Sequence, residues 1–177
     1  MDVDTDDEEL HVHNLTFNGT SLEDAKAFVQ QNLRDGVKCP ACGQLCKVYR
    51  RKLNSTMALA LVMIYTHFKL HPHHTWLHVA AFLVKVKRDS SIAGGDVVKL
   101  RYWGLLERAP GERDDGSDRV GRYRITSVGN QFVEGKIAVP RYVYLYNQLL
   151  LRLSEEMTTI RDALGDRFSY DELMKGS

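Results

Sequence analysis

The chain has 177 residues, of which 44% are hydrophobic and 27% are charged, and its formal net charge at pH 7 is +1. This length suits one domain with or without a small appendage, and this apolar share is enough for a core. No apolar run reaches the roughly 18 residues that a transmembrane helix needs, and the acidic N-terminus is unlike a secretory or mitochondrial address. We therefore expect a soluble, cytoplasmic protein without a membrane partner.

The charge is unevenly distributed along the chain. Six acidic residues lie within the first nine, so residues 10–177 alone carry a formal charge of +7. We expect residues 1–10 to form a disordered acidic tail. The same tail could compete with phosphate groups for a basic surface elsewhere on the molecule.

Residues 11–53 are expected to hold an N-terminal helix and a cysteine knuckle. Thr20 and Ser21 can start the helix, with Glu23 or Asp24 placed for a capping box, and Gly36 is a good stop. The helix carries apolar residues at helical spacing, so it is predicted to serve packing.

Three cysteines, Cys39, Cys42 and Cys46, follow within eight residues, which argues against a disulfide framework. Cys39-Pro-Ala-Cys-Gly has the form of a zinc knuckle, because two thiolates with two residues between them can bind one ion. Cys46 is a candidate third ligand of a structural zinc. His67 and His71, four apart on a predicted helix, are candidates for the fourth. The other histidines that could supply it are His11, His13, His73, His74 and His78. A cysteine-bearing turn without metal and a redox-active thiol pair are the alternatives.

A basic cluster follows the cysteines and contains Arg50, Arg51 and Lys52. These cations are candidates for contacts with phosphate groups. Alternatively, they protect a solvated edge strand from pairing. The sequence leaves both interpretations open.

Residues 54–138 predict a winged helix-turn-helix domain. Asn54 can cap a helix over residues 57–70 that is apolar on nearly every side and therefore central, and Pro72 closes it. The loop that follows holds a cluster of histidines. Such a cluster in a loop more often has no function than forms a metal site. A second helix is expected to begin at Trp76 and to end in a basic run, Lys85-Val-Lys87-Arg88.

The stretch 95–108 predicts a short basic helix, a glycine stop and the first strand of a hairpin. Lys99 and Arg101 should point away from the core, Trp103 should pack inward, and Gly104 should end the helix in a left-handed conformation. Residues 109–121 are polar and rich in turn formers, as in a wing tip. The return strand, 122–126, alternates, which places Arg122 and Arg124 on the outer face.

Residues 139–177 are expected to form a mixed α/β extension. Residues 142–146 have the composition of a strand. Residues 147–164 have apolar positions at helical spacing, which would suit a helix that pairs two copies. They also contain a plausible turn at residues 154–156 and a β-branched run, which would suit strands. The overall prediction is an α+β protein.

Two resemblances support this prediction. Trp103-Gly-Leu-Leu-Glu-Arg, together with Arg122-Tyr-Arg-Ile-Thr, resembles the recognition helix and wing of MarR- and PadR-type regulators. The second resemblance rests on five motifs: Cys39-Pro-Ala-Cys-Gly-Gln, Tyr49-Arg-Arg-Lys-Leu-Asn-Ser, Leu100-Arg-Tyr-Trp-Gly-Leu, Ala163-Leu-Gly-Asp-Arg-Phe and Tyr170-Asp-Glu-Leu-Met. Through these motifs the whole chain resembles a group of small, mostly uncharacterised proteins of tailed bacteriophages and prophages. This resemblance implies a mobile-element origin, with the host cytoplasm as location.

The function favoured by these patterns is binding of double-stranded DNA, as a transcriptional regulator or accessory factor. The residues expected to contact DNA are basic or small and polar: Arg50, Arg51, Lys52, Lys85, Lys87, Arg88, Ser90, Ser91, Lys99, Arg101, Arg119, Arg122 and Arg124. A module that binds and inhibits a host protein is the alternative. No nucleophile triad, P-loop or paired-carboxylate motif is present, so an enzyme is not expected. A homodimer would suit a regulator that binds two half-sites in DNA.

Overall fold

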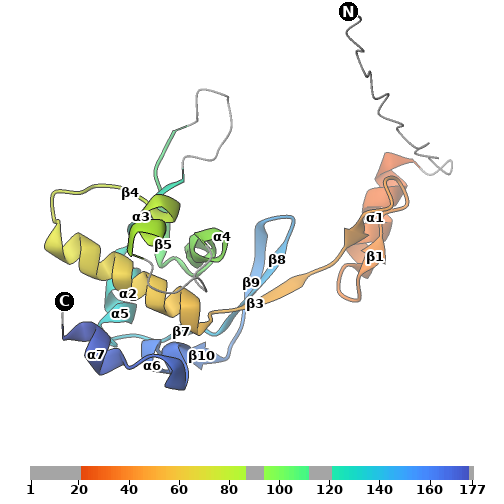
Figure 1. Cartoon of the computed structure of the whole chain (residues 1–177). Helices are drawn as coiled ribbons and strands as arrows, with labels where there is room; N and C mark the ends of the chain where they lie inside the picture. The colour runs from red at the N-terminus through yellow and green to blue at the C-terminus, as the bar shows by residue number, and fades with distance from the viewer. Residues whose placement is uncertain (1–20, 87–93, 112–120, 176–177) are drawn as a thin grey trace, which may run out of the picture. The chain divides into compact units, whose positions relative to one another are not determined.

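The computed structural model describes residues 21–86, 94–111 and 121–175 (Figure 1). These residues form helices and small antiparallel sheets, which confirms the predicted α+β class. Their contacts divide them into two compact units, residues 21–49 and residues 50–175. The predicted acidic tail, residues 1–10, lies outside the described residues. Within the described ranges, no helix is both long and apolar enough to cross a membrane.

The first unit contains helix α1 (Leu22–Asn32) and a hairpin of β1 (Val37–Lys38) with β2 (Leu45–Cys46). The Ser21 hydroxyl accepts a hydrogen bond from the Asp24 amide at 3.1 Å and so caps α1, as predicted. Gly36, at φ +89°, lets the chain leave the helix and enter β1.

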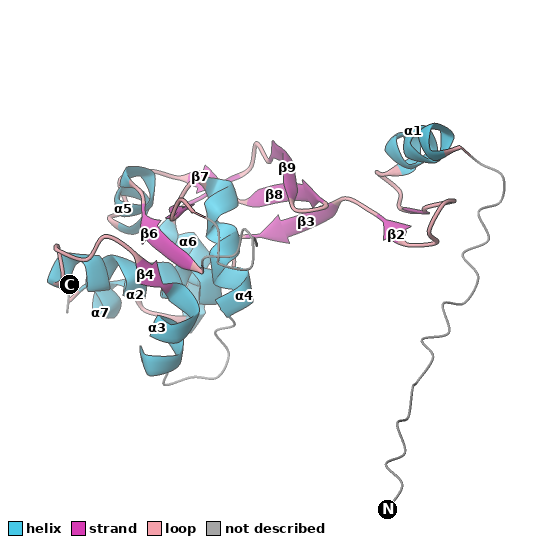
Figure 2. Cartoon of the chain, turned by 90° about the horizontal axis from the view of Figure 1, so that it is seen from above, coloured by secondary structure: helices cyan, strands magenta, loops and turns pink. Residues whose placement is uncertain are grey.

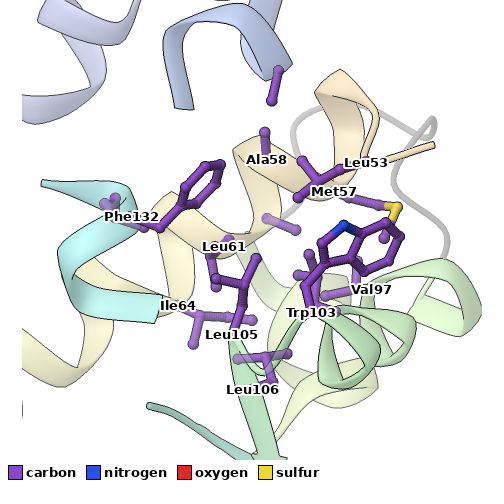
Figure 3. Packing of buried hydrophobic residues seen from close by; sticks show 14 of the residues in the cluster. Leu53, Met57, Ala58, Leu61, Ile64, Val97, Trp103, Leu105, Leu106 and Phe132 are labelled. Atoms are coloured by element: carbon purple, nitrogen blue, oxygen red, sulfur yellow. The ribbon is translucent and has the colours of Figure 1, made fainter. Parts of the chain in front are cut away.

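Helix α2 (Ser55–Leu70) is the centre of the second unit (Figure 3). The Asn54 side chain accepts from the Met57 amide at 3.0 Å, which fixes the start of the helix. The helix contacts α4, α5, α6 and β6, so it is covered from several sides. Its buried residues are Met57, Ala58, Ala60, Leu61, Val62, Ile64 and Tyr65. The predicted central helix is therefore confirmed.

The described elements that follow α2, up to α5, come in one order along the chain. They are β4 (Leu77–His78), α3 (Val79–Val86), α4 (Gly94–Val97) continued by the 3-10 helix η1 (Val98–Trp103), β5 (Leu106–Arg108), β6 (Arg122–Ile125) and α5 (Ser127–Val133). The three strands form an antiparallel sheet in the order β4–β6–β5. Figure 2 shows β4 and β6 beside α3.

Two sequence predictions in this region need correction. The helix expected from Trp76 begins at Val79, because Leu77 and His78 pair with Tyr123 and Arg122 of β6. The segment expected as an α-helix up to Gly104 is a 3-10 helix from Val98 onward.

The burial pattern of this segment explains the 3-10 geometry. Val97, Leu100 and Trp103 are all buried and lie three residues apart. Only the three-residue repeat of a 3-10 helix places such positions directly above one another.

The remaining elements complete two more sheets and the C-terminal helices. Strand β7 (Val139–Pro140) pairs with β10 (Met157–Thr158), and β3 (Tyr49–Lys52), β8 (Tyr142–Tyr146) and β9 (Leu149–Leu153) form a sheet in that order. Helix α6 (Ile160–Leu164), the 3-10 helix η2 (Gly165–Arg167) and α7 (Tyr170–Met174) follow. Residues 147–164 therefore form strands and a short helix, and the long helix considered for them is wrong.

Side-chain hydrogen bonds attach this C-terminal part to the helices. The Trp103 indole donates to the Pro140 carbonyl at 2.6 Å, and the Tyr170 hydroxyl donates to the Val133 carbonyl at 2.9 Å. Ile160 and Leu164 are each 1% exposed and belong to the core around α2. Residues 139–174 thus share one core with residues 54–138.

Candidate nucleic-acid interface

The segment 94–104 is held firmly on the core. Leu100 is fully buried, and the Trp103 side chain is anchored to Pro140. Gly104 adopts the predicted left-handed conformation, at φ +69°, and its amide donates to the Arg101 carbonyl. The chain therefore passes from η1 into β5 through one well-defined turn.

The two cations predicted to face DNA from this segment both have partners within the protein. The Lys99 ammonium lies 2.5 Å from an Asp96 carboxylate oxygen. The Arg101 guanidinium stacks 4.7 Å from the centre of the Tyr102 ring and donates to its hydroxyl, which in turn donates to the Gln148 carbonyl at 2.8 Å. Both side chains are half-buried. They would have to exchange these partners to reach a phosphate group.

The return strand β6 presents its arginines outward, as predicted. Tyr123 is 5% exposed, whereas Arg122 and Arg124 are exposed. Arg124 forms an ion pair with Glu107 and lies 4.7 Å from the centre of the Trp76 ring. The Trp76 stack was not expected from the sequence, because it depends on strand β4 bringing the preceding loop beside β6.

A cavity of about 580 Å³ lies beside Arg122. Its lining is rich in cationic and aromatic side chains: His67, His73, His74, Thr75, Trp76, Leu77, His78, Ala81, Phe82, Lys85 and Arg122. No carboxylate is among these residues, and Lys85 and Arg122 take part in no ion pair with any other residue that the structure describes. The exposed cations Lys85 and Arg122 therefore border a surface that favours anions.

The histidines of the α2 end and the following loop gather in one cluster. The rings of His67 and His71 lie 4.7 Å apart, as expected for one face of a helix, and His67 Nε2 lies 3.0 Å from His74 Nδ1. Burial lowers the pKa of His67, and repulsion from His71 and His74 lowers it further. Across the described ranges, no group of three or more potential ligands is arranged to hold a metal ion.

Arg50, Arg51 and Lys52 lie on strand β3, and all three are exposed. The Arg50 guanidinium stacks 4.6 Å from the centre of the Tyr142 ring on the neighbouring strand β8. These three cations of β3 therefore belong to a different sheet from Arg122 and Arg124, which lie on β6. The other predicted DNA contacts, Lys87, Arg88, Ser90, Ser91 and Arg119, lie outside the described residues.

The segment with Cys39 and Cys42 forms a tight turn between β1 and β2. The Cys39 amide donates to the Gln44 carbonyl at 2.8 Å, and the Gly43 amide donates back to the Cys39 carbonyl at 2.7 Å. Backbone hydrogen bonds from Cys42 and Ala41 lower the pKa of the Cys39 thiol. This favours the thiolate, which is the form that binds zinc. The Cys46 thiol is directed at the Gln44 carbonyl, 3.7 Å away.

No family model matches this chain, and neither a curated protein nor a solved structure matches it. Sequence patterns had identified Arg122, Arg124 and Lys85, but not their association with Trp76, His74 and His78. That association arises from strand β4, whose two residues are too few to show an alternating pattern.

Proposed function

We propose that the protein binds double-stranded DNA through a winged helix formed by residues 54–138. The order of elements supports this: α2, β4, α3, then α4 with η1, then the β5–β6 hairpin. The single most telling observation is the sheet order β4–β6–β5, in which the first strand pairs with the return strand of the hairpin. In this arrangement α4 and η1 would face the major groove and the hairpin would lie along the flanking backbone.

The charge distribution favours contacts with phosphate groups over readout of base edges. Lys85 and Arg122 are exposed and border a surface without carboxylates. Lys99 and Arg101 are tied to Asp96 and Tyr102. We therefore propose that α4 and η1 position the protein on DNA and read few base edges, so that sequence preference is modest. The affinity for DNA should then depend strongly on salt concentration.

We further propose that Cys39 and Cys42 bind a structural zinc ion. The hydrogen bonds that lower the pKa of the Cys39 thiol support this proposal. The ion would stabilise the short β1–β2 hairpin, which pairs only two residues on each side. Because Cys46 follows directly in β2, it is the nearest candidate for a third ligand.

Fluorescence anisotropy with a labelled DNA duplex tests the proposed function. We expect binding at low salt that weakens steeply as salt rises, and a several-fold loss of affinity in Arg122→Gln and in Lys85→Gln. Arg161→Gln is the matched control, because it removes the same charge from α6, which lies across α2 from α3 in Figure 1. Absence of binding at low salt, or an equal loss in the control, would refute the proposal.

A further inference from the structure

The sheet of β3, β8 and β9 (Figure 2) carries a row of tyrosines on one side. Along β8, Val143 and Leu145 are 0% and 7% exposed, whereas Tyr142, Tyr144 and Tyr146 are half-buried. Successive residues of a strand point to opposite sides of its sheet. The three tyrosines therefore share the side that faces away from the core, and we call this side the tyrosine face.

An arginine from each neighbouring strand lies over this face. The Arg152 guanidinium of β9 lies 3.6 Å from the centre of the Tyr144 ring, and the register places these two residues opposite one another. The Arg50 guanidinium of β3 lies 4.6 Å from the centre of the Tyr142 ring. Each ring covers one side of a guanidinium. Because both arginines are exposed, the other side is open to a ligand.

The charge of these three strands is entirely positive. Strand β3 contributes Arg50, Arg51 and Lys52, strand β9 contributes Arg152, and none of the three strands contains an acidic residue. Lys52 follows Arg50 by two residues, so it points to the same side of the sheet. A flat surface of this charge is complementary to a polyanion.

The spacing along β8 favours a single strand of nucleic acid over a duplex. Tyrosines two residues apart on a strand are about 6.6 Å apart, because each residue advances the chain by about 3.3 Å. Neighbouring bases in a duplex are only about 3.4 Å apart along each strand. Bases that occupy successive tyrosine positions must therefore be separated from one another, as an extended single strand allows.

We propose that the tyrosine face binds single-stranded nucleic acid. Bases stack on the open sides of the Arg152 and Arg50 guanidiniums, which Tyr144 and Tyr142 support from below, and Lys52 contacts a phosphate group. Bases stack on guanidinium planes as they do on aromatic rings, with little dependence on sequence. This proposal goes beyond the duplex binding proposed for residues 54–138 and does not rest on it.

Fluorescence anisotropy of the full-length chain with labelled oligo-dT and oligo-U, each about 12 nucleotides long, tests the proposal. We expect salt-dependent binding of at least one of them, and the comparison identifies the preferred sugar. Arg152→Lys and Arg50→Lys should each lower the affinity about tenfold, because each removes a surface on which a base stacks. Lysine keeps the charge but has no planar group, so a surface that acts through charge alone would tolerate both variants.

Arg161→Lys is the matched control. Arg161 also stacks on a tyrosine, with its guanidinium 4.2 Å from the centre of the Tyr170 ring, but it is paired with Asp171 at 2.7 Å. This variant should keep the wild-type affinity. Circular dichroism and thermal melting establish that each variant is folded. Absence of oligonucleotide binding at low salt, wild-type affinity in both Arg152→Lys and Arg50→Lys, or an equal loss in the control would overturn the proposal.

A duplex of the same length separates this proposal from the proposed function. The double variant Lys85→Gln with Arg122→Gln should keep the wild-type affinity for the oligonucleotides, and Arg152→Lys should keep the wild-type affinity for the duplex. A chain that binds the oligonucleotides through Arg152 but does not bind the duplex would support this proposal and refute only the winged-helix one. Oligonucleotide binding that is lost in the double variant and unchanged in Arg152→Lys would overturn binding at the tyrosine face.

Discussion

Substitution of Gly129 by alanine should destabilise the protein, although alanine is the better helix former. Gly129 is buried in α5, and a Cβ atom there would lie 2.3 Å from the Leu105 carbonyl oxygen and 2.7 Å from Ile125 Cγ1. The carbonyl is a main-chain atom that also accepts the Thr126 amide at 3.1 Å. It cannot retreat by the roughly 1 Å that ordinary contact requires without lengthening that hydrogen bond.

The magnitude follows from three opposing contributions. Overpacking costs about 1–3 kcal/mol, and a weakened buried hydrogen bond costs about 1 kcal/mol. The helix preference of alanine offsets about 1 kcal/mol. The net loss in the free energy of unfolding should be about 2 kcal/mol, or a fall of about 4–8 °C in Tm for a chain of this size.

Urea denaturation followed by circular dichroism measures this loss, and Gly95→Ala is the matched control. Gly95 lies in α4, and a Cβ atom there would meet no atom within 4 Å. The control should be neutral or stabilised by up to about 1 kcal/mol. If Gly129→Ala is as stable as its control, the close packing of α5 against the Leu105 carbonyl and Ile125 is refuted.

Three further predictions concern titration, metal and capping. Because burial and neighbouring histidines lower the pKa of His67, the unfolded chain takes up its proton first as the pH falls below about 6.5. The free energy of unfolding should therefore fall as the pH is lowered below about 6.5. A His67→Asn variant should lose less of this free energy over the same pH range, and an equal loss would contradict the role of His67. Elemental analysis after a chelator wash should find one zinc per chain, and none in Cys39→Ser; a metal-free wild-type protein would refute the zinc proposal. Thr126→Ala should lower the unfolding free energy by about 1–2 kcal/mol in urea melts, because the hydroxyl both caps Gly129 and donates to the Gly104 carbonyl; an unchanged midpoint would show that the cap is unimportant.

Elements with local signals were predicted well from the sequence. The caps at Ser21 and Asn54 and the left-handed Gly104 lie where short-range chemistry requires them. The apolar helix after Asn54 is central because no side of it can face water. Each of these features is specified by residues within one or two helical turns.

Elements that depend on distant partners were not predictable in the same way. Strand β4 has two residues and exists only because β6 pairs with it. The 147–164 segment has apolar residues at helical spacing, yet Asn147 and Gln148 adopt positive φ and reverse the chain into a hairpin. The residues around Lys85 and Arg122 are likewise gathered by tertiary pairing.

The salt dependence of duplex DNA affinity tests the central proposal most directly. Each phosphate contact that is lost lowers the slope of log affinity against log salt by about one. We predict that the magnitude of this slope is about two units lower in the double variant Lys85→Gln with Arg122→Gln than in the wild-type chain. The Arg161→Gln variant should keep the wild-type slope. A wild-type affinity that does not change with salt, or a double variant with an unchanged slope, would contradict DNA binding through this surface.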